Sequence, residues 1–300
     1  MGMSFELPQL SFVAPNFADN FIDSLRQYGF AAVVDHPLDN HRIERIYQDW
    51  LAFFASEEVS AFTMDPQSQD GYFSLQSAEH AKGFRDRDFK EYFQFYCWGR
   101  CPETLRTDLE AHFSAAVVLG ATLLGYIAHS LPASISAQLS EPLRDMIVDS
   151  QQTMLRVLHY PPVPEGQPVL RAAPHEDINL LTLLPAADGP GLELQLPEGE
   201  WISVPQQPGQ LIVNIGDMLQ EATGGFLPST THRVATPDVW HQSASRMSLP
   251  LFLHPRPDVV LSELGEDAVA RGAGSLALTL GQRRLAGVTA EPGRLGALEF

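Results

Sequence analysis

Cysteine is nearly absent from the sequence: the 300 residues include two, Cys97 and Cys101. They lie in the segment CWGRC, with no second pair and no histidine cluster beside them. Disulfide frameworks and zinc knuckles need more cysteines at repeated spacings, so both kinds of site are excluded. We predict that both cysteines are buried thiols.

Basic residues are scarce relative to acidic ones. Lys and Arg total 19 against 37 Asp and Glu, which gives a formal net charge of -18. A chain this acidic repels phosphate backbones and anionic lipid surfaces. The composition therefore predicts that neither nucleic acid nor membrane is a partner.

Long apolar runs and targeting signals are also missing. We find no apolar run that approaches the ~20 residues of a membrane helix. The start MGMSFELPQL has neither the basic residues nor the apolar core of a signal peptide. These absences predict a cytoplasmic protein.

Apolar residues make up 44% of the chain, which is enough for one large core. We predict an α+β protein with a single domain spanning residues 1–300. Within it we expect a mostly helical part over 1–150, a jelly-roll core that carries the functional site over 151–257, and a C-terminal helix and tail over 258–300.

The first half reads as an α/β segment followed by helices. Apolar and polar residues alternate within 5–15, and the apolar run FAAVVDHP covers 30–37, so both predict strands. Residues 65–90 predict loops with short strands. Apolar positions at helical spacing predict helices over 17–28, 40–54, 103–130 and 134–147.

From Gln151 the pattern changes to short apolar alternations separated by Pro and Gly. Six or more strands are predicted, including a hairpin in GLELQLPEGEWISVP and a buried strand over 210–219. Parallel strands would need crossover helices between them, and none is indicated here. The pattern therefore favours a jelly roll.

The segment PHEDINLLTLL carries a candidate metal site. His175 and Asp177 are two residues apart in an extended, apolar stretch, so their side chains should point to the same side. An imidazole and a carboxylate on one side form two thirds of the facial triad that holds non-haem Fe(II).

The rest of the chain offers a third ligand and an anion site. His232, in the strand-like segment STTHRVATP, is a candidate second imidazole, although position alone does not choose among ten histidines. Arg246 and Ser248 should share a strand face, where a planar guanidinium and a hydroxyl suit a carboxylate. An anion held there could reach the metal with its other end.

Taken together, these motifs resemble the isopenicillin N synthase-like branch of the Fe(II)/2-oxoglutarate dioxygenases. The resemblance includes LHYPP, HEDINLLTLL, GLELQ, WISVP, IVNIGDML and RMSLPLF, with YGFAAVVDHPL near the N-terminus, and so covers most of the chain. It implies a double-stranded β-helix and an oxidoreductase. The family oxidises unactivated carbons of small molecules by hydroxylation, desaturation or cyclisation, and decarboxylates 2-oxoglutarate to succinate.

The resemblance also implies residue roles. His175, Asp177 and His232 would bind Fe(II), while Arg246, Ser248 and Tyr160 would hold the cosubstrate 2-oxoglutarate, with O2 as the oxidant. Alternation on its strand suggests that Tyr160, not His159, faces the pocket. Asp217, in IGD, is interpreted as a structural turn residue.

Two departures from the family pattern bear on the reaction. The spacing from His232 to Arg246 is longer than usual. Gln69 stands where isopenicillin N synthase has an arginine, so β-lactam ring formation is not expected. Two alternatives remain open: an iron and O2 oxidase that does not use 2-oxoglutarate, and a non-catalytic module that binds small molecules.

The substrate is a small molecule, which could be anionic. Arg85, Arg87 and Lys90 form a positive cluster in this acidic chain. Arg85 or Arg87 could meet a carboxylate on the substrate. The alternative is that the cluster forms surface ion pairs with its acidic neighbours, which include Asp88 and Glu91.

Overall fold

The computed structural model describes residues 7–78, 88–163, 169–204, 206–235 and 244–261. Its α-helices are α1 (Phe17–Tyr28), α2 (Asn40–Phe54), α3 (Glu103–Ser130), α4 (Ala133–Ser136) and α5 (Asp217–Ala222), with 3₁₀ turns at Glu57–Phe62 and Asp145–Ile147. The strands are β1 (Gln9–Ser11), β2 (Phe30–Val34), β3 (Gly71–Phe73), β4 (Glu91–Phe95), β5 (Met154–Tyr160), β6 (Ala172–His175), β7 (Leu181–Pro185), β8 (Leu192–Gln195), β9 (Trp201–Ser203), β10 (Leu211–Ile215), β11 (His232–Val234), β12 (Arg246–Ser248) and β13 (Leu251–Leu253).

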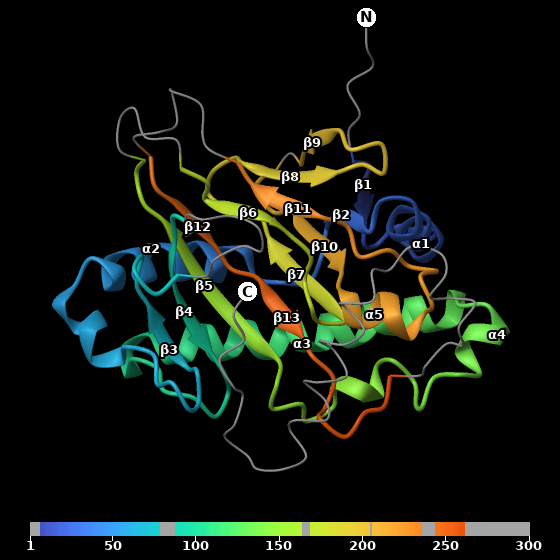
Figure 1. Cartoon of the computed structure of the whole chain (residues 1–300), viewed down its shortest axis with the longest axis horizontal. Coiled ribbons are helices and arrows are strands. Elements are labelled where there is room, and N and C mark those ends of the chain that lie inside the picture. Colours follow the sequence, from blue (N-terminus) through green and yellow to red (C-terminus); the bar gives the residue numbers. More distant parts are fainter. Residues whose placement is uncertain (1–6, 79–87, 164–168, 205, 236–243, 262–300) are drawn as a thin grey trace, which may run out of the picture.

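Two sheets form the centre of the molecule (Figure 1). The larger runs in the order β1-β2-β10-β7-β13-β5-β4-β3, with β12 also paired to β5, and the smaller runs β6-β11-β8-β9. Strands β1 and β2 pair in parallel. The other strand pairs among the described residues are antiparallel. This is the predicted jelly roll, a double-stranded β-helix.

The N-terminal α/β segment extends the larger sheet. β2 pairs with β10, so residues near the start of the chain continue the sheet built by the second half. Helix α1 ends at Gly29, which adopts a left-handed conformation, and a Cβ there would lie 2.3 Å from the Thr230 hydroxyl oxygen. Glycine is therefore required both for the turn and for the close approach of the segment before β11.

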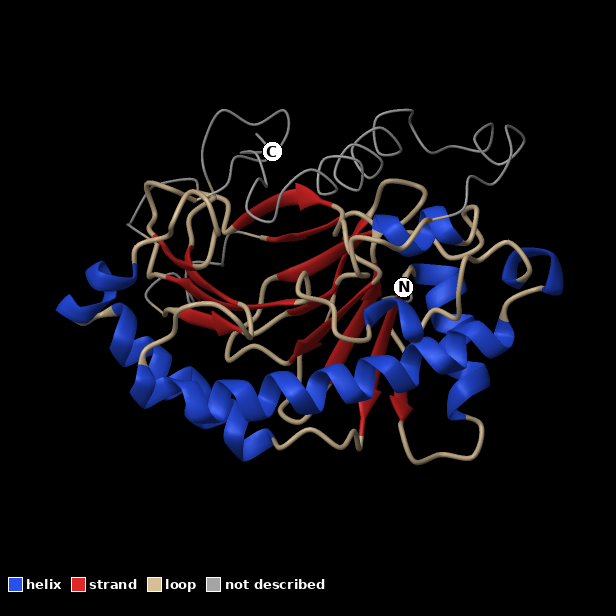
Figure 2. Cartoon of the chain, turned by 90° about the horizontal axis from the view of Figure 1, so that it is seen from below, coloured by secondary structure: helices blue, strands red, loops and turns tan. Residues whose placement is uncertain are grey.

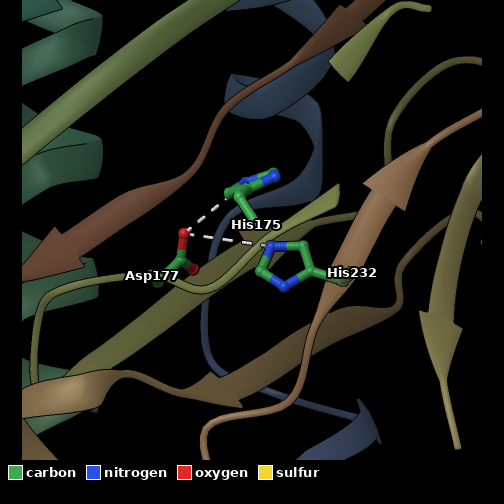
Figure 3. A group of neighbouring side chains, drawn as sticks. All are labelled: His175, Asp177 and His232. Atoms are coloured by element: carbon green, nitrogen blue, oxygen red, sulfur yellow. Dashed lines mark ion pairs between the residues drawn. The ribbon is translucent and has the colours of Figure 1, made fainter. Parts of the chain in front are cut away.

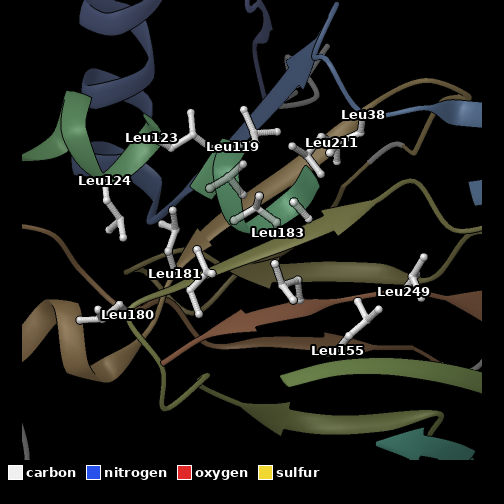
Figure 4. Packing of buried hydrophobic residues seen from close by; sticks show 14 of the residues in the cluster. Leu38, Leu119, Leu123, Leu124, Leu155, Leu180, Leu181, Leu183, Leu211 and Leu249 are labelled. Carbon is white, nitrogen blue, oxygen red and sulfur yellow. The ribbon is translucent and has the colours of Figure 1, made fainter. Parts of the chain in front are cut away.

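Helix α3 runs beneath the larger sheet, as Figure 2 shows, and spans the residues predicted for it. It contacts α1, α2, β7 and β13. Leu119, Leu123 and Leu124 of the helix face leucines of the strands in Figure 4. A Cβ on Gly120 would lie 2.2 Å from Leu253, so the absence of a side chain lets the helix approach β13.

The expectation that no apolar segment is long enough for a membrane helix was wrong for α3. By length and composition α3 could cross a membrane, with a mean hydropathy of 1.6 over an 18-residue window, of which 39% is buried. A core helix of a soluble protein passes the same test, and α3 packs on the sheet. The length and composition of this one helix are therefore weak evidence for a membrane span.

Four other predictions about local structure were wrong in detail. Cys101 is buried, but Cys97 is exposed in the turn after β4. The helix predicted over 134–147 is replaced by α4, which ends at Ser136, and a 3₁₀ turn, and Pro142 between them is incompatible with one continuous helix. The first strand stops at Ser11 in a turn, and the strand predicted over 210–219 ends at Ile215, before α5. Residues 262–300, most of the predicted C-terminal helix and tail, lie outside the described residues.

One buried histidine makes stability depend on pH. His112 of α3 is 2% exposed and its Nε2 atom has no hydrogen-bond partner among the described residues. Desolvation, reinforced by the charges of Arg42 and His36, lowers its pKa to about 4. The unfolded chain thus takes up a proton at this residue at higher pH than the folded chain does.

We predict that folded stability falls as the pH drops from about 6.5 to about 4, by about 3 kcal/mol from this residue. His112→Gln should flatten the profile of unfolding free energy against pH, measured by urea titration, over that window. His41→Gln, at an exposed position on α2, is the control and should leave the slope unchanged. An equal slope in wild type and His112→Gln would refute this assignment.

Candidate active site

Three predicted ligands converge between the two sheets. His175 is the last residue of β6 and His232 the first of β11, and the two are directly paired in the small sheet. Their ring centroids lie 4.4 Å apart. Asp177 lies in the segment between β6 and β7, and ligand atoms of all three lie within 4.8 Å of one another (Figure 3).

Asp177 lies beside His175 as predicted, but the strand geometry assumed for it was wrong. It does not continue a strand from His175, because β6 ends at His175 and β7 begins at Leu181. The chain turns between them, and a Cβ on Gly216 would lie 2.2 Å from the Asn179 carbonyl oxygen. The backbone N–H of Asp217 donates to the Asp177 carbonyl at 2.7 Å. The backbone of Asp217, the first residue of α5, thus helps to hold this turn, while the role of its side chain stays a prediction.

Hydrogen bonds set the orientation of both imidazoles. Nδ1 of His175 lies 2.8 Å from the Ala173 carbonyl oxygen, and Nδ1 of His232 lies 3.1 Å from that of Thr230. A carbonyl oxygen only accepts, so each Nδ1 carries the proton and each Nε2 presents a lone pair. These Nε2 atoms lie 3.9 and 3.8 Å from Oδ1 of Asp177.

The carboxylate of Asp177 is held on its other side. Its Oδ2 atom accepts hydrogen bonds from the Thr182 hydroxyl at 2.6 Å and the Asn214 amide at 2.8 Å. Burial alone would raise the pKa of Asp177, but His232, His175 and these hydrogen bonds together hold it below its usual value. Oδ1 of an ionised carboxylate thus faces the two imidazoles.

The electrostatics favour a neutral His175 ring beside this carboxylate. Desolvation and then the charge of His232 lower the pKa of His175, although 40% of its side chain remains accessible. Asp177 and His232 are far less exposed, at 7% and 10% of their side chains. The site therefore opens on the side of His175, where Nε2 of each histidine and Oδ1 of Asp177 converge. Two imidazoles and a carboxylate in this arrangement suit Fe(II).

The predicted anion site lies on the adjoining strands β5 and β12. Arg246 pairs with Tyr160 and Ser248 with Leu158 across the two strands. Arg246 is 1% exposed, and its Nε and Nη2 atoms donate to the Gly189 carbonyl and the Gln206 side chain. Its Nη1 atom is buried and has no partner among the described residues. A buried guanidinium with a free donor suits a carboxylate.

Alternation on β5 places Tyr160 and His159 as predicted. The Arg246 Cζ atom lies 5.1 Å from the centre of the Tyr160 ring. His159 points to the other face, where its Nδ1 lies 2.8 Å from Glu91 and its ring stacks on Phe54 of α2.

Of the predicted positive cluster, Lys90 is the member that the structure describes. Its ammonium lies 2.8 Å from Asp88, and both side chains are buried, so this is an internal pair and not a surface one. Asp88 also accepts the backbone N–H of Ala173 on β6. The charge of Lys90 contributes to lowering the pKa of His175, so Lys90 lies near the metal ligands. Arg85 and Arg87 fall outside the described residues.

Sequence reasoning missed the residues that support the site. Thr182 and Asn214 are single polar residues in apolar strands, LLTLL and IVNIG, a pattern that predicts a buried hydrogen bond. Arg171, a second buried arginine, lies in no sequence pattern that would predict its burial.

A hollow of about 150 Å³ lies between α2 and α3, away from these residues. It is lined by Ile46, Asp49, Trp50, Thr104, Leu105, Thr107 and Asp108.

Comparisons with known proteins agree with this geometry. The model of the 2OG-Fe(II) oxygenase superfamily matches residues 151–255, and that of the non-haem dioxygenase in morphine synthesis N-terminal region matches 7–111. Among curated relatives, 2-oxoglutarate-dependent dioxygenase 11 of Oryza sativa subsp. japonica is 28% identical over 257 residues, which are 80% of this chain and 67% of that protein. Flavanone 3-dioxygenase 2 of the same plant is also 28% identical, over 80% of this chain and 70% of its own length.

Solved structures extend the match to almost the whole chain. A putative oxygenase from Shewanella oneidensis is 43% identical, with a TM-score of 0.81 over 95% of this chain and 100% of that one. A putative 2OG-Fe(II) oxygenase family protein from Caulobacter crescentus is 28% identical, with a TM-score of 0.73 over 94% and 99%. The chain therefore belongs to the Fe(II)- and 2-oxoglutarate-dependent oxygenases, a family of oxidoreductases that use Fe(II), 2-oxoglutarate and O2.

Proposed function

We propose that this protein oxidises an unactivated carbon of a small molecule, by hydroxylation or by desaturation or cyclisation, and converts 2-oxoglutarate to succinate and CO2. One observation carries the proposal: three converging acceptor atoms lie in the same barrel as a buried Arg246 nitrogen that has no acceptor among the described residues. A divalent cation fits the first group and a carboxylate the second.

In this proposal His175, Asp177 and His232 hold the iron through Nε2, Oδ1 and Nε2. Bound Fe(II) supplies the redox chemistry by which O2 is activated. Thr182 and Asn214 keep Oδ1 of Asp177 directed at the histidines. The opening beside His175 admits substrate and O2, since its side chain is the most exposed of the three.

Arg246, Ser248 and Tyr160 hold the distal carboxylate of 2-oxoglutarate. Arg246 and Ser248 are buried on β12, where a charge-assisted hydrogen bond is protected from water. Tyr160 belongs to a buried cluster with Phe73, Tyr92 and other apolar side chains. This cluster forms an apolar wall that keeps water away from the carboxylate.

The substrate class is inferred from relatives. A Neurospora crassa protein of this fold is described in complex with alpha-KG and thymine, and JOX2 in complex with 2OG, Fe and JA. Those proteins bind small molecules, and we propose the same here. An anionic substrate group remains a prediction, with Arg85 or Arg87 as its partner.

Two other functions would use the same residues differently. In an oxidase that does not use 2-oxoglutarate, Arg246 and Ser248 would bind a substrate carboxylate. In a non-catalytic binding module the iron ligands would serve no reaction. The orientation of Asp177 by two buried donors argues against the second alternative, because a module without a metal gains nothing from three converging acceptors.

The first prediction from the proposed function concerns the binding of Fe(II) and 2-oxoglutarate together. Anaerobic addition of Fe(II) and then 2-oxoglutarate should produce the visible charge-transfer band of a chelated 2-oxo acid, and His175→Ala should abolish it. His129→Ala, on the exposed side of α3, is the control. With O2 and a screened substrate, succinate should form in step with substrate oxidation. Substrate oxidation without any succinate would instead support the oxidase that does not use 2-oxoglutarate.

A second prediction concerns the hydrogen bond behind Asp177. Asn214→Ala removes one hydrogen bond to Oδ2 of Asp177, which allows the carboxylate to rotate. The affinity for Fe(II) should therefore fall by about 10- to 100-fold. Calorimetric titration with Fe(II) under anaerobic conditions measures this affinity. Asn20→Ala, at an exposed position of α1, serves as the control. Equal affinities for Asn214→Ala and wild type would show that Asp177 does not depend on this support.

A third prediction concerns the anion site. Arg246→Met removes a buried charge that would pair with the distal carboxylate, so the Kd for 2-oxoglutarate should rise by about 30-fold or more. Fe(II) binding should change little, because the metal ligands lie on other strands. Arg106→Met, at an ion pair on α3, should leave both affinities unchanged. If Arg246→Met bound 2-oxoglutarate as wild type does, the assignment of this site would fail.

A further inference from the structure

A second arginine is buried beside the proposed 2-oxoglutarate site. Arg171 immediately precedes β6 and is 2% exposed, which makes it one of the largest fully buried side chains. Its Nη2 atom donates to the Ala244 carbonyl at 2.8 Å, but its Nε atom has no hydrogen-bond partner among the described residues. No carboxylate among the described residues forms an ion pair with it. Burying such a charge is costly unless an anion accompanies it.

The two buried arginines lie around one ring. The Cζ atoms of Arg171 and Arg246 lie 6.0 and 5.1 Å from the centre of the Tyr160 ring. Desolvation, and next the charge of Arg246, lowers the pKa of Arg171, so the guanidinium groups repel each other. Each has one buried nitrogen for which the described residues offer no acceptor: Nε of Arg171 and Nη1 of Arg246.

The charges around Tyr160 do not balance. Asp188 is the acid whose charge acts on both arginines. Its carboxylate already accepts the Met247 backbone N–H at 2.6 Å, and burial raises its pKa. Within the part of the chain that the structure describes, the two cations therefore share at most one nearby carboxylate. One further carboxylate, supplied by a ligand, would balance the group.

We propose that Arg171 is a second arginine of the 2-oxoglutarate site, whose free Nε–H donates to the distal carboxylate that Arg246 also holds. This inference rests on the proposed function. It assigns to Arg171 a part of the preference for 2-oxo acids that end in a carboxylate. A 2-oxo acid with an uncharged tail would leave both guanidinium groups buried without an anion, and would bind weakly.

The competing explanation is that Arg171 acts only on the backbone. Its hydrogen bond to Ala244 fixes the chain two residues before Arg246, so its loss could shift Arg246 without any direct contact to the ligand. A double-mutant cycle separates the two explanations, because an indirect effect disappears once Arg246 has been removed.

The experiment measures Kd by calorimetry on the full-length protein with Fe(II), without O2. The two ligands are 2-oxoglutarate and 2-oxopentanoate, which has a methyl group in place of the distal carboxylate. Arg171→Met should raise the Kd for 2-oxoglutarate at least ten-fold and that for 2-oxopentanoate less than two-fold. In the Arg246→Met background it should cause a further loss of at least three-fold for 2-oxoglutarate. Arg106→Met should match wild type throughout.

Three results would overturn the proposal: an unchanged Kd for 2-oxoglutarate, equal losses for the two ligands, or no further loss in the Arg246→Met background. If Arg171→Met does not fold, as judged by thermal melting, Arg171→Lys decides. Lysine keeps the charge but not the Nε–H, so it should lower the ratio of the two affinities, and an unchanged ratio would refute the role. Failure of the wild-type protein to bind 2-oxoglutarate would refute the proposed function itself.

Discussion

The metal centre depends on a carboxylate fixed between two sets of contacts. Oδ2 of Asp177 is held by Thr182 on β7 and Asn214 on β10, which are neighbouring strands of the larger sheet. Oδ1 faces His175 and His232, which are paired in the smaller sheet. The packing of one sheet on the other therefore sets the distance between the carboxylate and the imidazoles. Helix α3 and the leucine-rich core pack against the larger sheet, through β7 and β13.

The second half of the site follows from one strand pairing. Because β12 pairs with β5 in register, Arg246 lies opposite Tyr160 and is removed from water. Arg171 reaches the same ring from the start of β6, the strand that ends at His175. Arg171 and the metal ligand His175 thus lie at the two ends of β6, while Arg246 lies on β12.

Much of this arrangement could be predicted from the sequence. Strand and helix patterns defined the jelly roll and α3, and the motifs around His175, His232 and Arg246 indicated residues that the structure brings together. Asp177 lies beside His175 as predicted, but in a turn and not on a continuous strand. Alternation of side chains cannot reveal such a turn, in which Asn179 lies close to Gly216. Arg171 is an isolated arginine with no pattern around it. Its burial depends on the pairing of distant segments, which one sequence does not reveal.

Crystals grown without O2 in the presence of Fe(II) and 2-oxoglutarate test the central claim most directly, by anomalous diffraction at the iron absorption edge. The account predicts one anomalous peak bounded by Nε2 of His175, Oδ1 of Asp177 and Nε2 of His232. It also predicts electron density for the distal carboxylate of 2-oxoglutarate at Arg246. An iron peak away from these three residues, or 2-oxoglutarate bound elsewhere, would contradict the account.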